Sequence, residues 1–195
     1  AAGIKSFFTI KDGKRFAYSP ITKSMQTVYA PGQEDAFIVM KHFEGQTVWK
    51  NSACRTYHLG EDVLGLEWYT KMGSIGGEVL EGIQKSISLA EDKYKGLVIA
   101  NEGNNFSAGA NVGMIFMLAI EQEYDEMDMA IRMFQNTMMR ARYSSIPVVV
   151  APHSLSLGGA CELSLHSDKI CAAAETYIGL VELGIGLHPG AGSTR

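Results

Sequence analysis

Two glycine-rich segments of the sequence have the composition of turns that leave backbone amides accessible. The first, residues 105–111, reads Asn-Phe-Ser-Ala-Gly-Ala-Asn, and the second, residues 157–163, reads Leu-Gly-Gly-Ala-Cys-Glu-Leu. Each follows a short apolar run, residues 97–100 and 146–151, whose composition predicts a buried strand. Two amide N–H groups that converge on one point form an oxyanion hole, and Gly159 would add positive potential if it began a helix. Taken singly, each segment is better explained as an ordinary tight turn between a strand and a helix.

Two glutamates, Glu162 and Glu182, are the side chains best suited to proton transfer. Glu162 lies inside the second glycine-rich segment, and Glu182 follows twenty residues later, both among apolar neighbours. An unpaired carboxylate is costly in such surroundings, and proteins use this cost to tune a glutamate as a general acid or base. The alternatives are a glutamate that faces solvent, or one that pairs with a cation such as Lys169 or Arg195.

Several other kinds of chemistry are excluded because their motifs are missing. The sequence has no G-x-x-x-x-G-K-[ST] loop, no G-x-G-x-x-G after a strand and no G-x-S-x-G elbow. Its three cysteines (Cys54, Cys161 and Cys171) are too scattered for a disulfide framework, and no Cys or His pair has metal-ligand spacing. The formal net charge of -4, without a basic block, argues against nucleic acid as a partner. No apolar run approaches the roughly 20 residues of a membrane-spanning helix. We therefore expect reduced thiols, no metal, no membrane anchor and a cytoplasmic location.

The elements that must position these residues alternate between strand and helix, which indicates an α/β fold. Residues 1–46 differ, because short β-prone runs are separated by turn residues such as Asp12-Gly13, and we expect a small β-rich appendage there. Apolar residues recur at helical spacing in two later stretches, and the methionines of the second are expected to fill the core. The predicted strands cover residues 7–10, 15–18, 26–29, 53–58, 63–69, 97–100, 146–151, 169–174 and 176–180, and the predicted helices cover residues 77–94, 121–142 and 158–166.

Three segments, in order along the chain, resemble the consecutive signatures of the enoyl-CoA hydratase/isomerase (crotonase) family. Residues 105–111 are similar to its F-x-x-G-A-[DN] turn, residues 157–168 to its G-G-x-C-E-L turn and helix, and residues 175–194 to its G-L-x-E-x-G-x-x-P-G-x-G-[GS]-T segment. The resemblance extends over about residues 52–195. More closely, residues 49–52, 121–145 and 172–182 resemble the C-terminal hydratase region of bacterial proteins in which a 3-hydroxyacyl-CoA dehydrogenase precedes the hydratase. Asn111 and Ala160 differ from residues common in the family without removing a catalytic atom.

The resemblance implies a crotonase-like spiral of ββα units over residues 47–195, truncated before its C-terminal helices. Residues 1–46 would then be a β-rich connector from the upstream dehydrogenase. The ends of the sequence fit a fragment, because it begins Ala1-Ala2-Gly3 without an initiator methionine and residues 189–195 form a glycine-rich turn that leads toward a helix. The implied assembly is a homotrimer or a dimer of trimers.

The resemblance also implies roles for individual residues. The backbone N–H groups of Ala110 and Gly159 would hold a thioester oxygen. Glu162 would activate a water molecule and Glu182 would deliver a proton to Cα, although two close carboxylates titrate as a pair and share such roles. The residues expected to contact the substrate are Ala108, Gly109, Gly158, Pro189 and Gly190.

The implied reaction is hydration of a trans-2-enoyl-CoA to a 3-hydroxyacyl-CoA in fatty-acid β-oxidation. The chain itself would hold no cofactor, because CoA belongs to the acyl-CoA substrate and NAD would bind the upstream dehydrogenase domain. Two alternatives remain at this point. An enoyl-CoA isomerase can work with one glutamate, so the presence of two favours the hydratase. The chain could also be a non-catalytic oligomerisation or docking module of the dehydrogenase.

Overall fold

The computed structural model describes residues 6–11, 14–28 and 38–192. Contacts within the chain divide it into two compact units, Ala1–Gly45 and Gln46–Arg195. The division lies one residue from the boundary that composition predicts.

The first unit is a small antiparallel sheet of three strands in chain order. They are β1 (Phe8–Lys11), β2 (Lys14–Ser19) and β3 (Ser24–Thr27), and the 3-10 helix η1 (Met40–Gln46) follows. Lys11 pairs with Lys14, so the predicted hairpin pairing is confirmed, whereas its turn residues 12 and 13 lie outside the described residues. The third predicted strand, residues 26–29, is shifted toward the N-terminus, and Tyr29 also lies outside the described residues.

The second unit is built on a mixed sheet with the strand order β10-β8-β7-β6-β5-β4 in the described part of the chain. Its strands are β4 (Thr47–Lys50), β5 (Cys54–Gly60), β6 (Val63–Trp68), β7 (Gly96–Ile99), β8 (Val148–Val150) and β10 (Lys169–Ile170). Strands β4 to β6 pair antiparallel, and β6, β7, β8 and β10 pair in parallel. Glu61 and Asp62 both have positive φ at the predicted β5–β6 turn, as a tight hairpin turn with right-handed strand twist requires.

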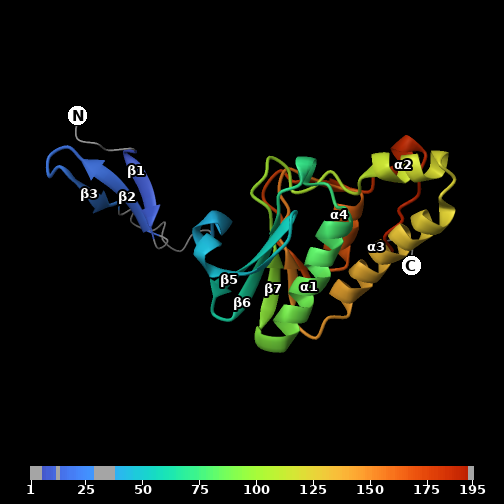
Figure 1. Ribbon diagram of the computed structural model, residues 1–195, viewed down its shortest axis with the longest axis horizontal. Coiled ribbons are helices and arrows are strands. Elements are labelled where there is room, and N and C mark those ends of the chain that lie inside the picture. The colour runs from blue at the N-terminus through green and yellow to red at the C-terminus, as the bar shows by residue number, and fades with distance from the viewer. Residues whose placement is uncertain (1–5, 12–13, 29–37, 193–195) are drawn as a thin grey trace. The chain divides into compact units, whose positions relative to one another are not determined.

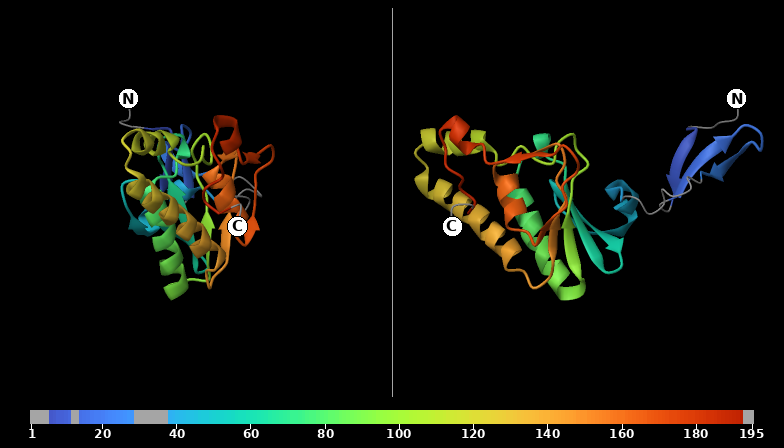
Figure 2. Two further views of the ribbon diagram at one scale, coloured as in Figure 1. Left: turned by 90° about the vertical axis from the view of Figure 1, so that its right-hand side faces the viewer. Right: turned by 180° about the vertical axis from the view of Figure 1, so that it is seen from behind.

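Two long helices, α1 (Gly77–Lys93) and α3 (Tyr124–Arg142), lie beside each other along the sheet (Figures 1 and 2). The predicted apolar stripe of α1 is confirmed, since Val79, Ile83, Ile87 and Ala90 are all buried. These side chains form the core together with Trp68 and residues of the central strands. Arg140 of α3 is paired through two hydrogen bonds with Glu91 of α1, which ties the two helices together.

The remaining elements follow the carboxyl ends of the parallel strands along the chain. They are the 3-10 helix η2 (Lys71–Gly73), α2 (Val112–Ile120), β9 (Leu155–Leu157), α4 (Gly159–Leu165), β11 (Tyr177–Gly179) and the 3-10 helix η3 (Glu182–Ile185). Strands β9 and β11 pair in parallel as a small separate sheet. This mixed α/β architecture agrees with the predicted fold class.

Two predicted element boundaries described below are wrong, and some elements were missed. The helix expected over residues 121–142 begins at Tyr124, because Gln122 has a φ of +61° and separates it from α2, an element that the sequence analysis missed. The strand expected over residues 169–174 ends at Ile170. Beyond it, the amides of Cys171 and Ala173 each donate one hydrogen bond, to the carbonyls of Val150 and Pro152. Strands β4 and β9 were also missed. No glycine or proline occurs between residues 118 and 125, so the sequence carries no local signal for the break.

Within residues 6–11, 14–28 and 38–192, no helix combines the length and apolar character needed to cross a bilayer. The same described residues contain no group of three or more His, Cys, Asp or Glu side chains placed to hold a metal ion.

Candidate active site

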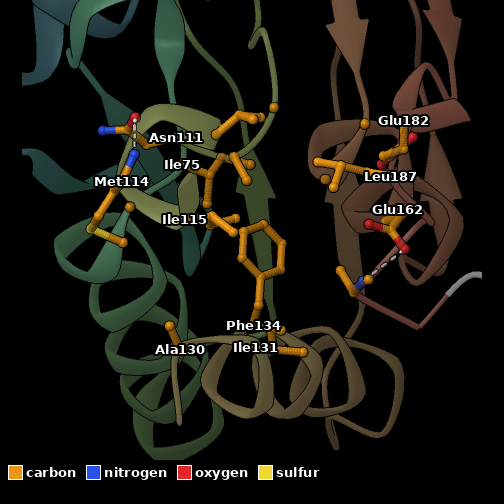
Figure 3. A pocket seen from close by; sticks show the side chains of 18 of the residues that line it. Ile75, Asn111, Met114, Ile115, Ala130, Ile131, Phe134, Glu162, Glu182 and Leu187 are labelled. Atoms are coloured by element: carbon orange, nitrogen blue, oxygen red, sulfur yellow. Dashed lines mark hydrogen bonds between the residues drawn. The ribbon is translucent and has the colours of Figure 1, made fainter. Parts of the chain in front are cut away.

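A cavity of about 310 Å³ lies between α2 and α3 on one side and the segments around α4 and η3 on the other (Figure 3). Its wall is mostly apolar, and the polar side chains in it are Asn111, Glu162, Glu182 and His188. A predominantly apolar cavity with few polar groups is typical of a site for a small organic ligand. The lining residues are Ile75, Gly76, Gly77, Leu80, Ala108, Gly109, Ala110, Asn111, Val112, Met114, Ile115, Ala130, Ile131, Met133, Phe134, Gly158, Gly159, Glu162, Val181, Glu182, Ile185, Leu187, His188, Gly190 and Ala191.

The two glycine-rich segments lie against each other at this cavity. Ser107 and Ser156 form a parallel β-bridge, in which the Ser107 amide donates to Leu155 and the Leu157 amide donates to Ser107. Gly109 then approaches the second segment so closely that a Cβ atom there would lie 2.7 Å from the Leu157 carbonyl oxygen. The same Cβ would lie 3.4 Å from the Gly159 nitrogen. Glycine is required at position 109 because of this contact and because its φ is +92°.

The amides of Ala110 and Gly159 both border the cavity. In the described part of the chain, neither amide donates a hydrogen bond to another protein group. The Gly109 carbonyl, which belongs to the same peptide group as the Ala110 N–H, accepts a hydrogen bond from the Ile75 amide. Gly159 begins α4, so its N–H is one of the groups that a helix leaves without an internal acceptor. Such amides are available to an oxygen atom of a ligand.

Glu162 is held on α4 with only 2% of its surface exposed. Its Oε1 atom accepts a hydrogen bond of 2.9 Å from the amide of Ala191, far along the chain. Its carbonyl accepts from both the backbone N–H and the ring Nδ1 of His166, the latter at 2.7 Å. The buried glutamate is therefore fixed at its backbone and at its carboxylate.

Glu182 occupies the first position of η3 and lines the cavity. It lies beside the start of the second glycine-rich segment, whereas Glu162 lies near the end of that segment. Its Oε1 atom would lie 3.1 Å from a Cβ atom on Gly158, so the carboxylate rests against the backbone of that glycine. Its Oε2 atom is buried and has no hydrogen-bond partner. A buried carboxylate oxygen without a partner is costly, and a ligand or a water molecule in the cavity would satisfy it.

The two carboxylates share one wall of the cavity, with Phe134 and Ile115 on the facing wall (Figure 3). The negative charges of both carboxylates also act on the thiol of Cys161, the residue before Glu162. Burial raises the pKa of the Cys161 thiol, and the negative charges of Glu182 and Glu162 raise it further. This thiol is accordingly an inert neighbour rather than a nucleophile.

One face of α3 forms the opposite wall of the cavity, and the sequence analysis missed this role. The prediction that the methionines of this helix fill the core holds for Met138, which is buried, whereas Met133 lines the cavity and Met129 is exposed. Phe134 lies at the centre of this wall, and its ring would be 2.6 Å from a Cβ atom on Gly159. The helical spacing of these residues was visible in the sequence, but core and cavity faces have the same apolar pattern.

The structure brings most of the predicted site residues together. Ala108, Gly109, Ala110, Gly158, Gly159, Glu162, Glu182 and Gly190 all line the cavity, whereas Pro189 does not, although both of its neighbours do. Lys169 forms no ion pair with either glutamate among the described residues, and Arg195 lies outside them. Gln135 and Ala191 were missed because the hydrogen bonds they make join segments far apart in the sequence. His166 was also missed, although its bond to the Glu162 carbonyl spans only four residues.

Residues 68–195 match the enoyl-CoA hydratase/isomerase family. The chain belongs to this family. Among curated relatives, it is 46% identical over 146 residues to "Probable 3-hydroxyacyl-CoA dehydrogenase" of Bacillus subtilis (strain 168), covering 75% of this chain and 18% of that protein. It is 35% identical over 147 residues to a Rickettsia prowazekii (strain Madrid E) protein provisionally named fatty acid oxidation complex trifunctional enzyme, covering 75% of this chain and 20% of that one. The chain thus spans about a fifth of the length of the curated relatives it matches.

Solved structures of the same family show the crotonase fold in this chain. The enoyl-CoA hydratase of Thermoplasma volcanium GSS1 is 27% identical with a TM-score of 0.64, covering 73% of this chain and 56% of that one. The enoyl-CoA hydratase of Bacillus anthracis is 25% identical with a TM-score of 0.65, with the same two coverages of 73% and 56%.

Proposed function

We propose that this chain carries the hydratase site of a longer protein and adds water across the double bond of a trans-2-enoyl-CoA to give a 3-hydroxyacyl-CoA. The observation that carries the proposal is the gathering of two unbonded amides and two glutamates around one apolar cavity. Membership of the enoyl-CoA hydratase/isomerase family supports the substrate class.

The two amides would act on the thioester end of the substrate. As water adds at Cβ, electron density moves to the thioester oxygen, and the N–H groups of Ala110 and Gly159 would bind the resulting enolate. Each such donor typically contributes a few kcal/mol to transition-state stabilisation. The close approach of Gly109 to the second segment, where an added Cβ would lie 3.4 Å from the Gly159 nitrogen, supports the proposal that the two amides bind one oxygen.

The two glutamates would move the protons. Glu162 would take a proton from the water as its oxygen bonds to Cβ, and Glu182 would give a proton to Cα, so that one water is consumed and both carboxyl groups exchange a proton with their surroundings afterwards. Two carboxylates on one wall suit this reaction because Cα and Cβ are adjacent. The unpartnered Oε2 of Glu182 is a place for that proton or for the shared water.

For the longer protein, the relatives support a wider proposal. A 3-hydroxyacyl-CoA dehydrogenase domain in the same polypeptide would bind NAD and oxidise the product of this site. The hydratase chain needs no cofactor of its own in this scheme, because CoA enters and leaves with the acyl group. We further propose fatty-acid oxidation as its setting, the cytoplasm as its location and a homotrimer or dimer of trimers as its assembly.

The test is hydration of crotonyl-CoA by the native polypeptide that carries this chain, followed as loss of the conjugated thioester absorbance. Hydration that disappears in both Glu162→Gln and Glu182→Gln supports the proposal. If the protein shifts a 3-enoyl-CoA double bond and tolerates Glu162→Gln, it is an isomerase that needs one glutamate. If it oxidises 3-hydroxyacyl-CoA with NAD but never consumes crotonyl-CoA, this chain is a non-catalytic module.

A further inference from the structure

One peptide group connects α3 to the carboxylate of Glu162. The carbonyl of Gly190 accepts a hydrogen bond of 2.8 Å from the side-chain Nε2 of Gln135. The N–H of the same peptide, which belongs to Ala191, donates to Oε1 of Glu162 at 2.9 Å. The two bonds therefore form a continuous chain from Gln135 through one peptide to Glu162.

The chemistry of the groups fixes the direction of this chain. A carbonyl oxygen can only accept, so the amide NH₂ of Gln135 must be the donor, and an ionised glutamate can only accept from Ala191. In a trans peptide the C=O and N–H bonds point in opposite directions, so Gln135 and Glu162 bind the peptide from opposite sides. A hydrogen bond to the carbonyl also polarises the peptide and strengthens donation by its N–H.

We propose that Gln135 is a positioning residue for Glu162, acting through the Gly190–Ala191 peptide to hold the carboxylate in the cavity. The catalytic consequence of this role rests on the function proposed above. Gln135 itself does not line the cavity, so it acts through the peptide rather than on the substrate.

The surrounding structure explains why this peptide needs a fixed support. Residues 187–190 belong to no helix or strand, and Ala191 is only 3% exposed, so a small movement of the segment would displace a buried hydrogen bond to Glu162. The next residue, Gly192, packs against the ring of His166, where an added Cβ would lie 3.3 Å from Nε2. His166 holds the carbonyl of Glu162, whereas Gln135 supports the peptide that holds the carboxylate.

Kinetics of the native polypeptide test the positioning role. Gln135→Met keeps the length of the side chain and removes the donor, whereas Gln135→Lys keeps a donor of sufficient reach. We expect Gln135→Met to lower kcat for crotonyl-CoA about threefold to tenfold, as for loss of one hydrogen bond, with KM changed by less than about twofold. Gln135→Lys should recover most of this loss, and Asn136→Ala, an exposed neighbour on the same helix, should match the wild type.

A spectroscopic readout separates this proposal from the hydratase proposal. Carbonyl ¹³C-glycine with ¹⁵N-alanine selects Gly–Ala pairs, of which this chain has three, and the 190–191 signal is assigned by its loss in Ala191→Ser. The Ala191 amide proton should move upfield in Gln135→Met and stay in place in Gln135→Lys and Asn136→Ala. An unmoved signal in Gln135→Met overturns the proposal, as does unchanged kcat in an active enzyme or an equal loss in the Met and Lys variants. If the wild type hydrates no crotonyl-CoA, the hydratase proposal fails and the Ala191 signal alone decides this one.

Discussion

The contact between the two glycine-rich segments makes Gly109→Ala the most informative single substitution. Position 109 has a φ of +92°, which a residue with a Cβ atom adopts only at a cost of about 1–2 kcal/mol. The new Cβ would also lie 2.7 Å from the Leu157 carbonyl oxygen, a backbone atom that cannot rotate away. Forcing an atom into such a packed place typically costs about 1–3 kcal/mol more. We expect the variant to lose about 2–5 kcal/mol of stability in total.

The same substitution should also affect catalysis. To relieve the contact, the chain at Leu157 must move away from Gly109, and the amide of Gly159 moves with it. A displacement of about 1 Å at a site of this kind can cost up to about a hundredfold in rate, so kcat should fall more than KM rises.

Urea unfolding of the 195-residue chain, followed by fluorescence of Trp49 and Trp68, measures the stability change, and crotonyl-CoA hydration by the native polypeptide measures the catalytic one. Gly184→Ala is the matched control, because this glycine in η3 has no atom within 4 Å of an added Cβ and no positive φ. It should change stability by less than about 0.5 kcal/mol. If Gly109→Ala were as stable and as active as Gly184→Ala, the reasoning from the contact would be wrong.

Three further predictions concern the acids, the helix pair and the first unit. Glu162→Gln and Glu182→Gln in the native polypeptide should each lower kcat for hydration by about 10² to 10⁴ with little change in acyl-CoA binding, and intact hydration in the first would show that one acid suffices. Hydrogen bonds from Arg140 hold the pKa of Glu91 at about 2, below its ordinary 4.5, so the pair stabilises the fold above about pH 4.5 and this stabilisation is lost as pH falls toward 2. The urea midpoint of Arg140→Met should therefore lie below that of the wild type at neutral pH and converge with it in acid, and a gap that persists in acid would contradict this. Removing residues 1–45 should leave kcat nearly unchanged, and a loss as large as that expected for the glutamate variants would show that the first unit contributes to the site.

Local sequence signals determined the elements whose apolar pattern or turn chemistry is strong. The stripe of Val79, Ile83 and Ile87 specified α1, and the residues at 60–62 specified the β5–β6 hairpin, because both patterns act over a few residues. Where no glycine or proline marks a boundary, as at Gln122, the helix was predicted to begin at residue 121 instead of Tyr124, and α2 before it was missed. Very short strands such as β9 were missed because their pairing depends on distant partners.

The sequence by itself identified most of the predicted site residues that line the cavity, because glycines that expose amides and glutamates in apolar surroundings are local features. Only the tertiary structure decided that these residues meet, since the Ser107–Ser156 bridge joins segments that follow different strands. It also decided that Phe134 faces the cavity while Met138 fills the core, although both lie on one apolar face of α3. The link from Gln135 to Glu162 lies furthest from the reach of sequence reasoning. The link runs through a backbone peptide. The partners to which a peptide hydrogen-bonds depend on how the chain folds around it rather than on its side chains.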